Sequence, residues 1–397
     1  IVVLCYFQLS FGIFSTKWDN LSAFFPYRYT ASHWWNNGHI PFWDPYQNLG
    51  SPMHANPQGA VWYPIARFFG MFGGYGIYQI NLELVFHIVV GGIGTYFLLS
   101  KHINNRKVQA VGALAYSLSG FVSSTSHMIG FTAGAAWLPW CLYFLVQAYQ
   151  YKKWYHSILL GLFTYLNLTG AYPAFSIVLA YIYIGYTFYY IFCQENKKLA
   201  IRTSMQLGLV TGITTLLLAA PFLYSIYDSL EYFNRAGGIP YDTKNFEGNF
   251  GWQAFQSLIV PYVISAKEGF RNLDVGMSNL YVGTTFLFFT ILYFFTKQKN
   301  RLAFVFLLLL SIALGLGNNT PVHQFFFEYV PGFSHFRHPY LFMLYTVLIF
   351  SIIGSISLQK VITQHSKKTY QALVVYGLIL FTIFSVSLTQ INYESIE

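Results

Sequence analysis

Long apolar stretches alternate with short polar loops along the whole chain. Coarsely, the apolar stretches are residues 1–16, 76–99, 108–126, 131–150, 157–170, 174–193, 203–225, 278–296, 302–316, 339–358 and 369–389. A membrane-spanning helix needs roughly 20 such residues, and this pattern predicts about eleven transmembrane helices. Several stretches are shorter, so we expect some helices to be tilted, broken or re-entrant. The period-two alternation of barrel strands is absent, which predicts an all-α polytopic membrane protein.

The loops between these stretches alternate in charge. The basic loops contain Lys101, Arg106 and Lys107; Lys152 and Lys153; Lys197, Lys198 and Arg202; Lys297, Lys299 and Arg301; Lys360, Lys367 and Lys368. Their single acid is Glu195. The other connections contain Asp19, Asp44, Asp228, Glu231, Asp242, Glu247, Glu268, Asp274 and Glu328. The positive-inside rule places the basic loops in the cytoplasm and the acidic loops outside.

Composition supports a membrane protein and excludes other classes. The chain is 55% hydrophobic, 21% aromatic and only 9% charged, which no soluble class matches. Its net charge of +9 follows from the topology rule, so we expect no nucleic-acid partner. Cys5, Cys141 and Cys193 lie in predicted spans without a spacing motif, so neither a disulfide framework nor a zinc site is indicated.

We expect residues 1–397 to form one transmembrane domain with three long outer loops, 17–75, 226–277 and 317–338. Within the first loop, residues 20–37 have aromatic spacing typical of an amphipathic interfacial helix. The chain starts inside an apolar run and stops just after another span. We therefore expect a fragment that lacks part of its first helix and a C-terminal extracytoplasmic region.

Two carboxylates of the first loop are candidate acid–base groups. Asp19 follows the first apolar stretch, where it is either a helix-end carboxylate in water or a base or metal ligand near the bilayer surface. Asp44, between Trp43 and Pro45, either braces a turn through its side chain or is a second acid. The residues alone leave both alternatives open.

Three further residues are candidates at the outer ends of spans. Glu83 and His87 are four residues apart and share one helix face. A carboxylate inside a membrane is costly, so the pair is either functional or a structural hydrogen-bonded pair between helices. Arg337 lies just before a span, where its guanidinium either binds a phosphate or extends to lipid headgroups.

Motifs of other enzyme classes are absent from the sequence. No phosphate-binding glycine loop, serine-hydrolase elbow, zinc-protease motif or paired Cys motif occurs. Glycines 91, 92 and 94 lie inside a predicted span and indicate close helix packing. No clear internal repeat is present, which weakens a secondary-transporter hypothesis.

A series of short motifs resembles one family. In order they are Asp19; Pro41-Phe42-Trp43-Asp44-Pro45-Tyr46 with Gly50 and Pro52; Asn56-Pro57-Gln58 to Tyr63-Pro64; Gly170-Ala171-Tyr172-Pro173; Ala220-Pro221 leading to Arg235; Ala313-Leu314-Gly315 through Asn319-Thr320-Pro321 to Pro331-Gly332-Phe333; and Phe336-Arg337-His338-Pro339. Together they resemble the YfhO-like bacterial membrane proteins of the GT-C class of lipid-phosphosugar-dependent glycosyltransferases. Asp44, His338 and Tyr340 depart from the pattern.

The resemblance implies a GT-C-like bundle, with Asp19 as the catalytic base and a polyprenyl-phosphate sugar as donor. Arg337, Arg235 and His87 are its candidate donor-binding residues, and Asp44 and Glu83 are candidate second acids. The aromatic residues expected to contact sugar or lipid are Trp18, Trp43, Tyr46, Trp62 and Tyr63. No metal or cofactor is firmly predicted, although the chemistry leaves room for a divalent cation.

The leading hypothesis is an inverting glycosyltransferase on the outer face of a bacterial inner membrane. Its acceptor would be a glycan, lipid or protein of the cell envelope, and its other partners the bilayer and components of a membrane complex. The alternatives are a lipid-linked sugar transporter or flippase, and a non-catalytic scaffold subunit. A transporter predicts charges at the membrane midplane, whereas a transferase predicts that Asp19 and Arg337 lie at one outer cavity.

Overall fold

The computed structural model describes residues 1–47, 49–241, 250–261, 263, 273–295, 298, 300–364, 371 and 375–377. The described residues are largely helical and contain no strand, which agrees with the all-α prediction.

The α-helices are α1 Val2–Cys5, α2 Phe7–Ser10, α3 Phe25–Asn36, α4 Pro64–Gly70, α5 Ile77–Leu99, α6 Arg106–Ser117, α7 Gly120–Ser124, α8 Ile129–Tyr151, α9 Trp154–Gly170, α10 Pro173–Cys193, α11 Lys197–Asp228, α12 Thr284–Phe294, α13 Arg301–Gly315, α14 Pro321–Tyr329 and α15 Met343–Gln364.

Five helical segments of the described chain are long and apolar enough to cross a membrane. They are α5, α8, α10, α11 and Pro339–Gln364, which includes α15. The stretches predicted at 108–126, 157–170, 278–296 and 302–316 instead contain helices of 17 residues or fewer. Residues 1–16 do not form the predicted continuous span, because two single-turn helices interrupted at Tyr6 replace it. Apart from 371 and 375–377, the stretch 369–389 lies outside the described residues.

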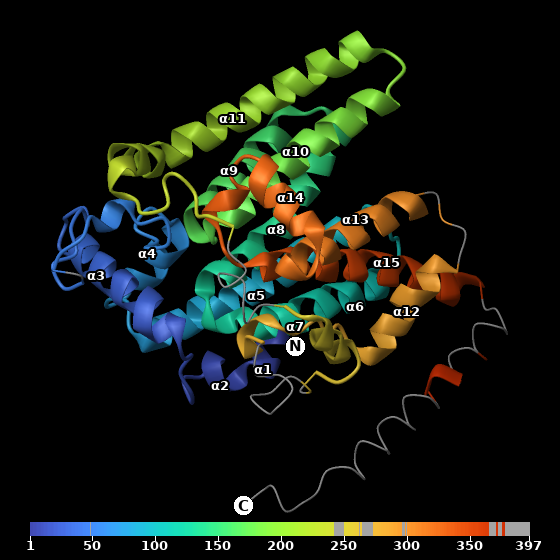
Figure 1. Ribbon diagram of the computed structural model, residues 1–397, viewed down its shortest axis with the longest axis horizontal. Coiled ribbons are helices and arrows are strands. Elements are labelled where there is room, and N and C mark those ends of the chain that lie inside the picture. The colour runs from blue at the N-terminus through green and yellow to red at the C-terminus, as the bar shows by residue number, and fades with distance from the viewer. Residues whose placement is uncertain are drawn as a thin grey trace, which may run out of the picture.

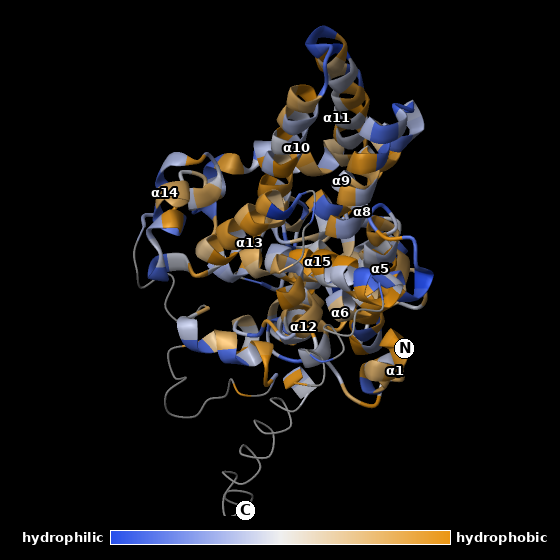
Figure 2. Ribbon diagram, turned by 90° about the vertical axis from the view of Figure 1, so that its right-hand side faces the viewer, coloured by the Kyte–Doolittle hydropathy of each residue, from blue (hydrophilic) through white to orange (hydrophobic). Residues whose placement is uncertain are grey.

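The long helices divide into a central group and an outer pair. The apolar windows of α8 and of residues 339–364 are 72% and 78% buried inside the protein, whereas those of α10 and α11 are only 17% buried. Figure 1 shows α11 running along one edge of the bundle beside α9 and α10. Figure 2 shows hydrophobic residues along these helices and a hydrophilic turn at their shared end. Their large apolar faces therefore have no cover within the described chain, as expected for helices in lipid.

Small residues let the central helices approach closely. A Cβ atom added at Gly91 of α5 would lie 3.1 Å from the main-chain oxygen of Ala135 in α8, and one at Gly94 would lie 2.7 Å from the Trp140 ring. A side chain on Gly112 of α6 would similarly meet Ser355 of α15. The prediction that glycines 91 and 94 mark helix packing is therefore confirmed.

Residues in or beside three of the predicted basic loops lie together at one end of the bundle. Lys297, Lys299, Lys367 and Lys368 lie outside the described residues. Lys101, after α5, donates its Nζ hydrogen to Gln150 Oε1 of α8 at 3.1 Å. The main-chain nitrogens of Asn104 and Asn105 both donate to Gln359 Oε1 of α15, at 2.9 and 3.1 Å. Helices that alternate in direction bring these loops together, which is the arrangement that the charge pattern predicts.

The first outer loop caps the opposite end and contains the expected interfacial helix. A π-helix, Asn20–Phe24, continues directly into α3, so residues 20–36 are helical. Figure 1 shows α3 and α4, in blue, beyond the ends of the central helices. The loop is attached through a hydrogen bond from the Thr16 main-chain nitrogen to Asn81 Oδ1 of α5, at 3.0 Å.

A buried ion pair makes the second attachment of this loop. Arg28 of α3 donates from Nη2 to Glu83 Oε1 at 3.2 Å and from Nε to Glu83 Oε2 at 3.3 Å. The Tyr75 hydroxyl also donates to Glu83 Oε2. Arg28 is 3% exposed and Glu83 is fully buried, so each charge depends on the other for compensation. A helix of the outer loop is thereby fixed to a membrane-spanning helix.

We expect loss of either charge to destabilise the protein. Arg28→Met or Glu83→Leu leaves one buried charge without its partner, which typically costs about 3–5 kcal/mol. The double variant removes both charges and should lose much less than the sum of the single losses. Chemical denaturation in detergent measures these differences, and additive losses would contradict mutual compensation.

Candidate functional site

Two arginines from distant parts of the sequence lie at the end of the bundle that the charge pattern predicts to be the outer one. Arg235 follows the 3-10 helix Leu230–Tyr232, and Arg337 precedes the segment that leads into α15. Their segments are joined by a hydrogen bond from the Ile239 main-chain nitrogen to Ser334 oxygen, at 2.8 Å. The His335 ring nitrogen Nε2 also bonds the main-chain oxygen of Ala236, at 3.3 Å.

Tyr172 lies near both arginines, whose positive charges act on its hydroxyl group. Burial raises the pKa of Tyr172, and the two nearby positive charges partly oppose this increase. A hydrogen bond from the Tyr172 main-chain nitrogen to Gly130 oxygen, at 3.0 Å, holds the residue immediately before Pro173, the first residue of α10. The structure thus brings together two arginines named from the sequence.

His338 lies beside the arginines on an aromatic base. Its ring centroid is 6.0 Å from that of Tyr172 and 6.2 Å from that of Phe131. Burial, followed by the positive charges of Arg337, Arg235 and His127, lowers the pKa of His338 to about 4. At neutral pH this imidazole is therefore uncharged, and it does not add a third cation to the site.

Arg235 and Arg337 are both exposed, and neither forms an ion pair with a carboxylate of the described residues. Two cations around one tyrosine hydroxyl are suited to a phosphate, whose oxygens accept several charge-assisted hydrogen bonds. We name this group of Tyr172, Arg235, Arg337 and His338 the arginine site.

Asp19 lies at the same end of the bundle. It is exposed, begins the π-helix, and its carboxylate makes no hydrogen bond or ion pair with other described residues. The preceding Trp18 contacts the His127 ring edge-to-face, with centroids 5.2 Å apart. His127 in turn is one of the groups whose charge acts on His338. Asn20, which follows Asp19, is hydrogen-bonded to Ile129, and Tyr172 of the arginine site is hydrogen-bonded to Gly130, so both regions lie at the start of α8.

Asn20 positions Asp19, although no sequence pattern singles it out. Its fully buried amide accepts from the Ile129 main-chain nitrogen at 2.8 Å and donates to Ser126 oxygen at 2.7 Å and to Thr16 Oγ1 at 2.8 Å. These bonds hold the start of the π-helix against the beginning of α8. An amide that bridges distant main-chain groups resembles any other polar residue in the sequence, so only the structure could identify it.

The structure gives Glu83 and His87 structural partners. Both oxygens of Glu83 accept hydrogen bonds within the buried ion pair, so the carboxylate is not available as the second acid proposed from the sequence. His87 Nε2 and the Tyr63 hydroxyl form a hydrogen bond of 2.6 Å, and Trp137 Nε1 donates to the same hydroxyl at 2.8 Å. His87 and Tyr63 are fully buried, so neither side chain is exposed to a ligand in this structure.

Asp44 also has a structural role in the first loop. It is fully buried, its Oδ1 accepts from the Tyr46 main-chain nitrogen at 2.9 Å, and it forms an isolated antiparallel bridge with Ser51. These contacts correspond to the first alternative for Asp44, in which its side chain stabilises a turn. They do not show the Asp44 carboxylate exposed to a substrate. A Cβ atom on Gly50, at a φ of +106°, would lie 2.5 Å from the Trp43 ring, which explains why glycine occupies this turn.

The aromatic residues named from the sequence differ in accessibility. Trp18, Trp43 and Tyr46 are 52%, 53% and 83% exposed, so all three can contact a ligand or lipid. Trp62 is half-buried and donates its Nε1 hydrogen to His54 oxygen at 3.0 Å. Three exposed aromatic side chains therefore remain candidates for sugar or lipid contact.

No group of three or more His, Cys, Asp or Glu side chains with the geometry of a metal site occurs among the described residues. Comparison with protein-family models and with curated proteins finds no match for this chain. The chemistry of the outer end must therefore be inferred from its own residues.

We expect His338 to make stability depend on pH. The pKa of a histidine in an unfolded chain is about 6.5, whereas that of His338 is lowered to about 4. Between these values the unfolded chain binds a proton that the folded chain does not, so stability decreases as the pH falls. His338→Gln should reduce this decrease in melting temperature, whereas the exposed control His33→Gln should not. Identical pH profiles for both variants would contradict the assignment.

Proposed function

We propose that the protein is an inverting glycosyltransferase that uses a polyprenyl-phosphate sugar at the outer face of a membrane. The observation that carries the proposal is that two hydrogen bonds join the segments of Arg235 and Arg337 beside Tyr172, at the same end of the bundle as the exposed Asp19. Two cations suited to a leaving phosphate and one carboxylate suited to a base at one end of the bundle support the proposal.

The proposed reaction uses these charges in one displacement. Asp19 accepts the proton of an acceptor hydroxyl, and the hydroxyl oxygen attacks the anomeric carbon of the donor sugar. The bond between that carbon and the phosphate oxygen breaks, and its electron pair leaves with the polyprenyl phosphate. Arg337 and Arg235 stabilise the negative charge on the departing phosphate. Neutral His338 does not compete with the arginines as a cation.

The membrane provides the route for the lipid part of the donor. The weakly buried faces of α10 and α11 are apolar over most of their length, and Tyr172 directly precedes α10. A polyprenyl chain lying beside these helices would have its phosphate near the interface. Exposed Trp18 lies next to Asp19 and can stack on the sugar, since an aromatic face packs against apolar C–H groups.

The distribution of charge favours a transferase over the two alternatives. Within the described spanning helices, Glu83 is the sole charged residue away from the helix ends, and its charge is compensated by Arg28. A transporter that moves an anionic headgroup needs polar groups deeper in the membrane. A scaffold has no requirement for an unpaired carboxylate at the same bundle end as two unpaired guanidinium groups.

We expect Asp19→Asn to abolish most sugar transfer. The amide keeps the size of the side chain but cannot accept the hydroxyl proton, and loss of a general base typically costs at least about 100-fold in rate. Transfer from a radiolabelled polyprenyl-phosphate sugar to membrane acceptors measures the effect. Asp228→Asn, an exposed change at the outer end of α11, is the matched control. Transfer by Asp19→Asn at the wild-type rate would exclude the proposed base.

We expect Arg337→Lys to weaken donor binding. A lysine keeps the charge but cannot form the planar two-donor contact with phosphate. Loss of one charge-assisted hydrogen bond costs roughly 1.5–3 kcal/mol, which corresponds to about a tenfold to hundredfold increase in Kd. Titration with a polyprenyl phosphate measures the change, and Arg106→Lys at the cytoplasmic end is the control. Equal affinities of the two variants would contradict a phosphate contact at Arg337.

A further inference from the structure

One side of α4, in the first outer loop, is apolar and has no cover within the described chain. Phe68 of this helix and the two residues that follow it, Met71 and Phe72, are 53%, 62% and 67% exposed. The rings of Phe68 and Phe72 contact each other edge-to-face, with centroids 5.3 Å apart. The first two residues of α5, Ile77 and Tyr78, are exposed as well. An exposed apolar surface of this kind marks an interaction site. We name Phe68, Met71 and Phe72 the α4 patch.

The contacts of α4 fix its position along the bundle. The Tyr63 hydroxyl, immediately before α4, is hydrogen-bonded to His87 Nε2 of α5 and to Trp137 Nε1 of α8. Near the other end of α4, the Phe69 ring contacts the Phe86 ring of α5 edge-to-face, with centroids 5.9 Å apart. Both ends of α4 are therefore attached to the same turn of α5.

The length of α5 places that turn inside the membrane. The helix contains 23 residues, which is about 35 Å of α-helix, and the hydrocarbon core of a bilayer is roughly 30 Å thick. A helix that only just spans the core cannot project far beyond it. Phe86 lies nine residues after Ile77, the first residue of α5, or about 14 Å along the helix axis. The segment that contacts Phe86 therefore lies at the depth of the lipid acyl chains.

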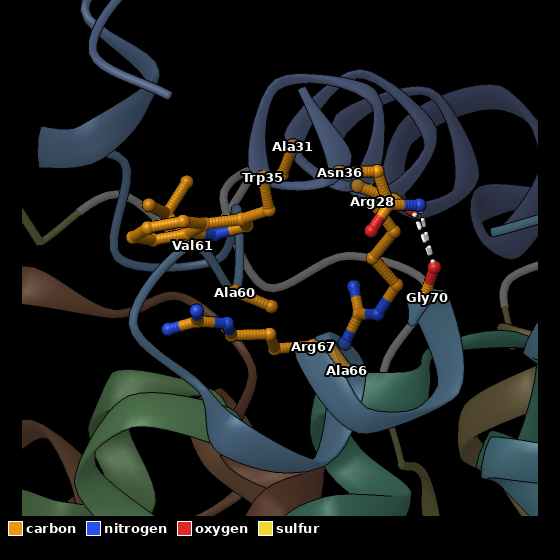
Figure 3. Close-up of a pocket in the computed structure, with 10 residues that line it drawn as sticks. Arg28, Ala31, Trp35, Asn36, Ala60, Val61, Ala66, Arg67 and Gly70 are labelled. Carbon is orange, nitrogen blue, oxygen red and sulfur yellow. Dashed lines mark hydrogen bonds between the residues drawn. The ribbon is translucent and has the colours of Figure 1, made fainter. Parts of the chain in front are cut away.

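The main-chain groups at the end of α4 have the partners that such a depth requires. No water is present among acyl chains to satisfy the free carbonyls of a helix end. The Gly70 oxygen accepts from Ser32 Oγ at 3.1 Å and from Asn36 Nδ2 at 2.9 Å, both in α3 (Figure 3). The Met71 main-chain nitrogen donates to Arg67 oxygen at 3.1 Å. These polar groups are thus bonded to protein, while the apolar side chains remain exposed.

One cation borders the α4 patch. Arg67 precedes Phe68, is exposed, and makes no ion pair with a described carboxylate. Its guanidinium carbon lies 4.1 Å from the centroid of the Trp35 ring, and Figure 3 shows the two side chains next to each other. A long cationic side chain that extends along an aromatic ring can keep its charge among lipid headgroups while its stem stays in apolar surroundings. The charge of Arg67 is therefore compatible with lipid around Phe68.

We propose that α4 is a short re-entrant helix whose patch contacts lipid acyl chains, in the leaflet that the charge pattern predicts to be the outer one. Arg67 reaches the phosphates of the same leaflet. The occupant of the patch is lipid because α4 is attached to α5 at a depth where lipid surrounds a spanning helix. The first outer loop is then held by the membrane as well as by the Arg28–Glu83 ion pair. This interaction does not depend on the proposed transferase activity.

Spin-label depth measurements test the proposal. The protein is reconstituted into phosphatidylcholine vesicles with Cys5, Cys141 and Cys193 replaced by serine, and a nitroxide is attached to Met71→Cys. Collisions of the label with oxygen and with a water-soluble nickel complex should place it about 5–10 Å below the lipid phosphates, the depth reached by the apolar faces of interfacial helices. Gln58→Cys, an exposed polar position in the same loop, is the matched control and should be accessible to nickel. Equal nickel accessibility at both positions would overturn the proposal.

A second measurement uses the wild-type chain and covers the case in which the serine background does not fold. Phosphatidylcholine with a diazirine in one acyl chain is photolysed in the vesicles, and adducts are located by mass spectrometry. The peptide that contains residues 68–72 should be labelled, as should α10. Labelling of α10 without labelling of residues 68–72 would overturn the proposal. A nitroxide at Met71→Cys that is shielded from both oxygen and nickel and is broadened by a second label would show that another copy of the chain covers the patch, which would also overturn it.

Discussion

The buried Arg28–Glu83 ion pair is the constraint on which the outer end of the protein depends. Burying the Glu83 carboxylate in α5 would be energetically costly without a counter-charge. The Arg28 guanidinium, from α3 in the first outer loop, provides that counter-charge. Because both charges are buried, the loop cannot leave the bundle without removing the counter-charge of Glu83 in α5. The pair therefore converts a long loop, rich in proline and glycine, into a fixed cap on the membrane helices.

Compensated charges inside and uncompensated charges at the surface divide the outer end into two regions. The ion pair, Tyr75 and the hydrogen-bonded His87 and Tyr63 form a closed interior in which the polar groups largely satisfy one another. Asp19, Arg235 and Arg337 are instead exposed and unpaired among the described residues. Charges that already have partners provide stability, whereas charges without partners remain available for a substrate. This division is the reason that the arginine site, rather than the larger number of buried polar groups, carries the functional proposal.

Several predictions from residue pattern were correct because they depend on local physics. Apolar length identified α5, α8, α10 and α11, and charge alternation predicted that the loops beside Lys101, Gln150 and Gln359 lie at one end of the bundle. The length of an apolar stretch did not distinguish a membrane-spanning helix from a shorter helix. Residues 1–16 and 108–126 were predicted to span the membrane but contain shorter helices. Sequence reasoning could not decide between the two alternatives for Glu83 and His87, because a polar residue inside a helix follows the same pattern whether it contacts a ligand or another helix.

The sequence by itself determined the helical class, the principal membrane helices, the alternation of the loops and the candidate status of Asp19, Arg235 and Arg337. These properties follow from hydrophobic length, from the cost of moving charge across a bilayer and from residue chemistry. Only the tertiary structure decided which polar residues compensate one another and which stay exposed. Partners such as Arg28 and Glu83, or Tyr172 and Arg337, are separated by dozens of residues or more. Their pairing depends on how helices pack and on the space left between them, which no local pattern encodes.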